Sequence, residues 1–195
     1  MSYCAAGSLG LRVQREGPIA WPEAMRIGVK LCGALETAHL TGTLHRDIKP
    51  ANVLVNDYGE PQLTDFGTAH VAGGYETASG LFSGTVDFLA PEVMTGDPAT
   101  VETDVYSLGA TLYKLITGQT PPDANDVLEN GLPDIEDMMS TQCADAIKKA
   151  MRSKRAYRQQ SIDEFLNMLP QEETIEATAD DDDVEIVEAE DKLGN

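Results

Sequence analysis

The chain has 195 residues, 42% of them hydrophobic, and a formal net charge of −19 at neutral pH. This length and apolar content fit one soluble globular domain with a sizeable core. The strong negative charge argues against nucleic acid and against anionic membrane surfaces as partners, because both would repel the chain.

The three cysteines, Cys4, Cys32 and Cys143, lie far apart and form no C-x-x-C motif. An odd number of dispersed cysteines predicts reduced thiols and a cytoplasmic location. The N-terminal residues show no pattern of a secretory signal, and no window approaches the roughly 20 apolar residues of a membrane span. We therefore expect no membrane association.

Two helices are predicted in the first 42 residues. Residues 8–15 fit a short helix, and the turn-rich stretch GPIAWP follows it. A longer helix is predicted from Pro22, because apolar residues recur at steps of four and three and form one stripe: Ile27, Leu31, Leu35 and Ala38. Gly42 is suited to end this helix.

A β-hairpin is predicted next. The short apolar runs NVLV and QLTDF are separated by the turn-rich stretch NDYGEP. Residues 67–90 are rich in Gly, Ser and Thr without any period, which indicates an ordered or switchable loop.

Further helices are predicted in the second half. The clearest covers residues 104–117, with Asp104 at its start and Gly118 just beyond its end. Weaker patterns cover residues 145–152 and 161–169. The expected fold class is therefore mainly α with a small β-hairpin (α+β).

The composition changes at Pro170. Residues 171–195 hold eleven acidic residues against the single base Lys192, so they contribute ten of the nineteen negative charges. High charge without aromatic residues predicts a disordered acidic tail. Mimicry of a phosphorylated or nucleic-acid-like surface is the less favoured interpretation of this tail.

The stretch HRDIKPAN groups residues suited to phosphoryl transfer. The Asp47 carboxylate can accept or orient the proton of an attacking hydroxyl. Lys49 can neutralise a transferring phosphoryl group. The amide oxygen of Asn52 can bind a hard cation such as Mg²⁺, and the hairpin returns the chain with Asp65 as a second oxygen ligand.

These motifs resemble those of a known family. HRDIKPANVLV, DFG, SGTVDFLAPE and DVYSLGATLYKLITGQTPP occur in the order and spacing of the eukaryotic-like (Hanks-type) bacterial Ser/Thr protein kinases. The resemblance covers residues 1–170, with the hinge at 1–10, the catalytic loop at 45–52 and the activation segment at 65–92. It implies the C-terminal lobe (C-lobe) of a kinase, with ATP and Mg²⁺ as cofactors and Ser/Thr-containing proteins as substrates.

The resemblance assigns catalytic and metal-binding roles. It implies that Asp47 is the catalytic base, that Lys49 contacts the γ-phosphate and that Thr85 hydrogen-bonds both. Asn52 and Asp65 are implied as the Mg²⁺ ligands.

It also assigns a nucleotide-binding segment. The backbone of Ser2, Tyr3 and Cys4 matches the hinge that hydrogen-bonds adenine, and Met1 falls at the gatekeeper position. Leu54 matches the floor beneath the adenine ring.

Other matches are structural. Glu92 and Arg158 resemble the buried ion pair that ties the activation segment to the last helices. Asp104 resembles the residue that holds the HRD backbone, a role compatible with an ordinary helix cap. His45 and Phe66 fit the regulatory hydrophobic spine.

Several side chains have weaker assignments. Arg46 marks kinases whose activation loop is often ordered by phosphorylation, and the candidate acceptors are Thr77, Ser79 and Ser83, with a flexible polar loop as the equal alternative. His39 and His70 have no partner at metal-ligand spacing, and we expect ordinary surface or core histidines.

The N-terminal lobe (N-lobe) of the family has no counterpart in residues 1–195. No G-x-G-x-x-G loop is present, and Lys30 in IGVK is predicted to be a solvent-facing helical lysine. We expect intrinsic activity to be very low, because several groups that position the phosphates are missing. A kinase with a start assigned too late, a non-catalytic module that binds another kinase, its targets or a separate N-lobe, and a decaying fragment remain alternatives. The short region between Pro122 and Cys143 favours erosion of a docking element.

Overall fold

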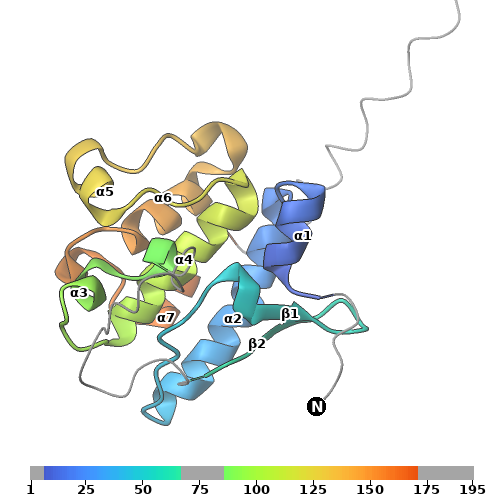
Figure 1. Ribbon diagram of the computed structural model, residues 1–195, viewed down its shortest axis with the longest axis horizontal. Helices are drawn as coiled ribbons and strands as arrows, with labels where there is room; N and C mark the ends of the chain where they lie inside the picture. The colour runs from blue at the N-terminus through green and yellow to red at the C-terminus, as the bar shows by residue number, and fades with distance from the viewer. Residues whose placement is uncertain (1–6, 67–85, 171–195) are drawn as a thin grey trace, which may run out of the picture.

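The computed structural model describes residues 7–66 and 86–170. This part is mainly helical and has one two-stranded antiparallel sheet, which confirms the predicted fold class. Figure 1 shows the hairpin along one side of the molecule, beside α1 and α2, with the other helices grouped around α4.

The first two helices match their predictions closely. α1 spans Leu9–Glu16, and Ser8 caps it by accepting a hydrogen bond from the Leu11 backbone at 3.3 Å. α2 spans Trp21–Leu40 and buries Ile27, Leu31 and Leu35 of the predicted stripe, whereas Ala38 is half-buried. The hinge predicted at residues 1–10 overlaps α1, because Leu9 and Gly10 are already helical.

The hairpin pairs β1 (Val53–Val55) with β2 (Pro61–Leu63), with Val53 opposite Leu63. The Asn56 side chain closes the turn by accepting hydrogen bonds from the backbones of Tyr58 and Glu60, each at 2.9 Å. The second strand is shorter than predicted. The chain leaves the sheet after Leu63, and Asp65 takes a positive φ of 64°, which does not continue a strand.

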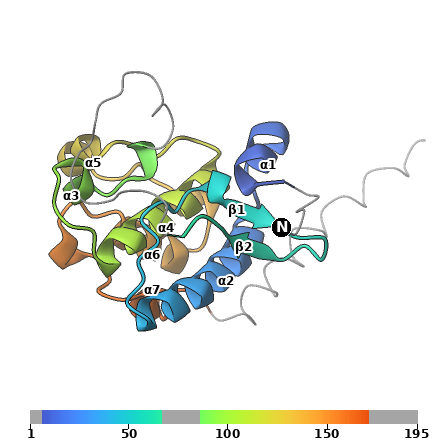
Figure 2. The same ribbon diagram turned by 60° about the horizontal axis from the view of Figure 1, so that its bottom comes forward.

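α4 spans Val101–Thr117 and contacts α2, α6 and α7, as both views show (Figure 2). It begins three residues before the predicted start. Thr100 is the N-cap, and its backbone N–H donates to the Thr103 hydroxyl at 3.0 Å, so the helix-cap interpretation of Asp104 was wrong. Asp104 lies one turn inside the helix and is fully buried, which leaves its carboxylate available to bond another segment.

The remaining helices are short: α3 (Pro91–Met94), α5 (Ala124–Asn130), α6 (Thr141–Ala150) and α7 (Ile162–Leu166). Single 3₁₀ turns cover Pro50–Asn52 (η1), Val86–Phe88 (η2), Glu136–Met138 (η3) and Arg155–Tyr157 (η4). α5 was not predicted. α6 begins earlier than predicted and α7 is shorter at both ends.

The core lies between α2, α4 and α6. Gly109 allows α4 and α6 to pack closely, because a Cβ at this position would lie 2.8 Å from the Cβ of Ala150 in α6. Cys32 and Cys143 are buried free thiols, and burial raises the pKa of Cys32 to about 12. None of the helices in the described ranges combines the length and apolar character that a membrane crossing requires.

Candidate active site

The residues predicted for phosphoryl transfer meet in the loop before β1. The ammonium Nζ of Lys49 lies 2.9 Å from Oδ2 of Asp47, and both side chains are largely buried. The amide nitrogen of Asn52 donates to the Asp47 backbone oxygen at 2.7 Å and to Oδ2 at 2.8 Å. Both amide hydrogens are thus directed at Asp47, so the amide oxygen of Asn52 faces away from this residue.

Asp104 fixes the backbone of this loop from inside α4. Its carboxylate accepts hydrogen bonds from the backbone N–H groups of His45 at 2.9 Å and Arg46 at 2.8 Å, as the resemblance implied. Arg46 has a φ of 69°, a left-handed conformation that costs energy for a residue with a Cβ. The buried carboxylate therefore stabilises a strained turn that sets the direction of the next residue, Asp47.

His39 was expected to be an ordinary surface or core histidine, but the structure shows a specific contact for it. Nε2 of His39 lies 2.8 Å from Oδ2 of Asp104, so the histidine on α2 is the third group bonded to this carboxylate. The two residues are 65 positions apart, and no local pattern marks such a pair. His39 is thus a positioning residue that supports the loop through Asp104.

The imidazole of His45 connects Asp47 to the end of the hairpin. Its Nδ1 accepts the Asp47 backbone N–H at 3.2 Å, and its Nε2 lies 2.9 Å from the carbonyl oxygen of Thr64. These contacts require the neutral tautomer with hydrogen on Nε2. Burial lowers the pKa of His45, which favours the same neutral form, and its ring lies 4.5 Å from that of Phe66, centre to centre.

This arrangement predicts a specific pH dependence of stability. Unfolded histidine titrates near 6.5, and His45 titrates lower in the folded protein, so the unfolded state binds more protons between these values. The free energy of unfolding should therefore fall as the pH drops from about 7 through the folded pKa. Urea unfolding of the parent and of His45→Phe across this range checks the prediction. His45→Phe should be less stable at neutral pH and show a flatter dependence; equal slopes would contradict it.

Asp65 follows the hairpin on the side of the catalytic loop. The Thr64 backbone N–H donates to the Asn52 carbonyl at 2.9 Å, so Thr64 lies beside Asn52. Asp65 is the next residue along the chain. Its carboxylate is exposed and accepts from the Thr64 hydroxyl at 3.3 Å. Residues 7–66 and 86–170 hold no group of three or more His, Cys, Asp or Glu placed for a metal. An amide oxygen and a carboxylate fit Mg²⁺ bound partly through phosphate oxygens.

Leu54 occupies the predicted position of the adenine floor on β1, where it is half-buried and bridges to Ser8 at the start of α1. The backbone N–H of Val55 donates to the Gly7 carbonyl at 3.1 Å, so β1 is joined to the second half of the predicted hinge. Several predicted residues lie outside the described residues: Ser2, Tyr3, Cys4, Thr77, Ser79, Ser83, Thr85 and His70. Their roles stay predictions.

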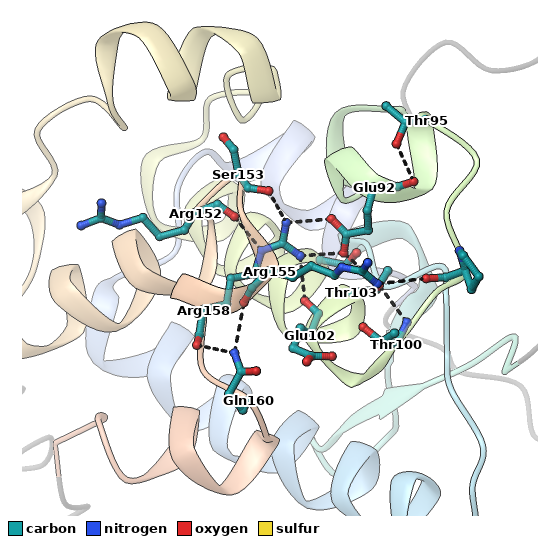
Figure 3. Close-up of polar contacts among 12 residues, drawn as sticks. Glu92, Thr95, Thr100, Glu102, Thr103, Arg152, Ser153, Arg155, Arg158 and Gln160 are labelled. Atoms are coloured by element: carbon teal, nitrogen blue, oxygen red, sulfur yellow. Dashed lines mark hydrogen bonds and ion pairs between the residues drawn. The ribbon is translucent and has the colours of Figure 1, made fainter.

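The predicted ion pair between Glu92 and Arg158 is confirmed (Figure 3). Nη1 and Nη2 of Arg158 donate to the two carboxylate oxygens of Glu92 at 2.7 and 2.8 Å, and the guanidinium side chain is fully buried. Three backbone carbonyls, of Glu102, Arg152 and Ser153, accept its other hydrogen bonds. The pair thus joins α3 to α4 and to the chain after α6.

The charge of Glu92 depends on this partner. Burial acts to raise the pKa of Glu92, but the hydrogen bonds and positive charge of Arg158 outweigh burial, and the pKa lies below its ordinary value. The stability that this carboxylate contributes is therefore present above its unfolded pKa and is lost as the pH falls through the lowered folded value.

The helical fold and the loop before β1 together define a kinase-like C-lobe. The model of the protein kinase domain matches residues 1–178. The chain belongs to the protein kinase family, and its relatives place it among the Ser/Thr kinases of bacteria.

Three relatives illustrate the range of similarity. Serine/threonine-protein kinase PknK of Mycobacterium tuberculosis is 58% identical over 118 residues, which cover 60% of this chain and 11% of the relative. Probable serine/threonine-protein kinase pknA2 of Bifidobacterium longum is 36% identical over 65% of this chain and 17% of the relative. Probable serine/threonine-protein kinase CPE1738 of Clostridium perfringens is 31% identical over 87% of this chain and 26% of the relative. The matched stretches thus span about a tenth to a quarter of these proteins.

Proposed function

We propose that this chain supplies the catalytic half of a Ser/Thr protein kinase that transfers the γ-phosphate of ATP to Ser or Thr hydroxyls of proteins. The observation that carries the proposal is the contact set of Asp47, which pairs with Lys49 and accepts two hydrogen bonds from Asn52. A carboxylate held in this way keeps one orientation, as a base for an incoming hydroxyl requires.

The residues divide the reaction between them. Asp47 orients the hydroxyl and takes its proton as the hydroxyl oxygen forms a bond to the γ-phosphorus and the bond to the departing ADP oxygen breaks. Lys49 stabilises negative charge on the transferring group. Asn52 and Asp65 would hold Mg²⁺, which supplies positive charge next to the phosphates. Thr85 is proposed to orient Asp47 and Lys49 from the activation segment.

The rest of the nucleotide site is proposed from the family alone. The hinge backbone of Ser2, Tyr3 and Cys4 would bind adenine, with Leu54 beneath the ring. Residues 1–195 contain no G-x-G-x-x-G loop to cover the phosphates, so we expect weak binding of Mg·ATP by these residues alone. A non-catalytic binding module is the second candidate, because such a module needs no tight binding of nucleotide.

A titration with Mn²⁺ and ATP tests the metal and nucleotide roles. Mn²⁺ replaces Mg²⁺ and broadens the NMR signals of nearby amides. In the presence of ATP, the strongest broadening should fall on the catalytic loop and on residues 64–66, and Asp65→Asn should remove it. Mn²⁺ without ATP is the control for binding to the acidic residues 172–191, and Asp57→Asn in the hairpin turn is the matched exposed substitution. Broadening that is the same with and without ATP would contradict the proposed roles and favour the module.

A further inference from the structure

The chain between α6 and α7 carries an uninterrupted run of positive charge. Residues 146–162 contain no Asp or Glu, although the whole chain has 33 acidic residues against 14 basic ones. The six bases of this run are Lys148, Lys149, Arg152, Lys154, Arg155 and Arg158. Such a concentration of one sign in a strongly acidic protein is a candidate binding surface for an anionic segment.

Two of these bases already have carboxylate partners. Arg158 is buried against Glu92, and Lys148 pairs with Glu136 at 2.7 Å and Asp134 at 3.7 Å. Their positive charges already face carboxylates, so neither residue is counted in the binding surface for an anionic segment.

The other four bases are Lys149, Arg152, Lys154 and Arg155. The side chains of Arg152 and Arg155 point to opposite sides of the Glu92–Arg158 pair (Figure 3), so we define the basic patch by Lys149, Arg152 and Lys154. None of them forms an ion pair with a carboxylate of the described ranges. Arg152 and Lys154 are exposed, and Lys149 and Arg155 are half-exposed.

Acidic residues border this run. Asp145 and Asp163 lie at its two ends in the sequence, and Asp97 is next to the Pro98 carbonyl that Arg155 contacts at 3.4 Å. The Glu164 carboxylate accepts from the Gln160 backbone at 2.9 Å, and the Glu102 carbonyl accepts from Arg158.

The end of the described domain lies near α6, the helix that carries Lys149. The side chain of Gln159, the residue after Arg158, donates to Sδ of Met168 at 3.3 Å. This bond holds the end of the domain against the chain between α6 and α7. Leu169 and Pro170 are buried, and the acidic residues from 172 onward follow them in the sequence. The run Asp180–Asp183 lies ten residues beyond Pro170, a stretch that can span up to about 35 Å, whereas a domain of this size has a radius of gyration of about 15 Å.

We propose that the acidic tail, residues 172–191, docks on the basic patch of its own chain. Residues 1–170 carry a net charge of −9, so the tail is repelled by most of this surface and attracted where bases gather without acids. A tether of a few residues gives the tail a millimolar effective concentration, which a separate acidic peptide must exceed to compete. The docked tail would cover the surface between α6 and α7, next to the Glu92–Arg158 pair.

A spin label on the tail tests this contact in the full chain. Ala177→Cys carries a nitroxide in a Cys4→Ser background, where Cys32 and Cys143 are retained because both thiols are buried. We expect selective broadening of the amide signals of residues 149–156 at about 0.01 M salt and its loss at about 1 M salt, where the screening length falls from about 30 to about 3 Å.

Matched variants separate a specific contact from a general charge effect. Arg152→Glu with Lys154→Glu should remove the broadening. Arg15→Glu with Arg26→Glu, which changes the net charge equally at exposed positions of α1 and α2, should leave it intact. Changing Asp180, Asp181, Asp182 and Asp183 to Lys in the reversed-patch variant should restore it.

Three results would overturn the proposal. The first is broadening that stays unchanged in the variant with Arg152→Glu and Lys154→Glu, or that is lost equally in the control with Arg15→Glu and Arg26→Glu. The second is broadening that passes from labelled to unlabelled molecules in a mixed sample, because the occupant would then be the tail of a second copy. The third is an unbroadened patch whose signals shift when a poly-glutamate peptide is added, because the patch would then bind a separate acidic partner.

Discussion

Glu92→Ala is expected to lower the free energy of unfolding by about 3–5 kcal/mol, the usual cost of leaving a buried charge without its partner. The Arg158 side chain has no solvent exposure, so water cannot replace the lost carboxylate. The guanidinium also lies over the Tyr106 ring at 4.9 Å and cannot turn outward without leaving that contact and three backbone carbonyls. Chemical denaturation at neutral pH measures the loss.

Two controls distinguish a stranded charge from a general packing defect. Glu136→Ala breaks the exposed pair with Lys148 and should change the free energy of unfolding by no more than about 1 kcal/mol. The double change Glu92→Leu with Arg158→Met removes both charges and should cost less than Glu92→Ala alone. A single variant as stable as the parent would contradict the role given to this pair.

The sequence predicted those parts of the fold that depend on local patterns. The apolar stripe of α2 and the turn chemistry between β1 and β2 produced the observed elements, because their residues face the core or close a turn within a few positions. The start of α4 was missed because the residue that bonds the N-cap backbone of Thr100 is Thr103, where a capping box usually has Glu or Gln. α5 was missed because its sequence, ANDVLEN, has little apolar periodicity.

In the candidate site, too, spacing along the chain predicted contacts between residues close in sequence but not those between distant residues. The spacing within HRDIKPAN was enough to predict that Asp47, Lys49 and Asn52 act together, and the structure brings their side chains into contact. The contact of His39 with Asp104 joins residues far apart in the chain, and the positive φ of Arg46 arises because a buried carboxylate holds that turn. Neither is encoded locally, so neither could be read from one sequence.

The second large effect is expected at Asp47. Asp47→Asn keeps the side-chain size and still allows an oxygen to accept from Asn52, but it removes the proposed base and the partner charge of Lys49. We expect the rate of phosphate transfer to fall by about 10²–10⁴-fold, the typical contribution of a positioned base. The loss should arise in kcat, since the proposed role of Asp47 is to act on the reacting hydroxyl.

Transfer of labelled γ-phosphate from ATP to Ser/Thr peptides is the measurement that tests the proposed function most directly. We would use residues 1–195 alone and residues 1–195 joined after the N-lobe of a protein kinase, each as parent, Asp47→Asn and Asp57→Asn. The proposed function predicts little transfer by residues 1–195 alone and ready transfer by the joined protein. That transfer should be lost in Asp47→Asn and kept in Asp57→Asn, an exposed position in the hairpin turn. A folded joined protein that binds ATP but transfers no phosphate, or transfers it equally with Asn at position 47, would contradict the proposed function.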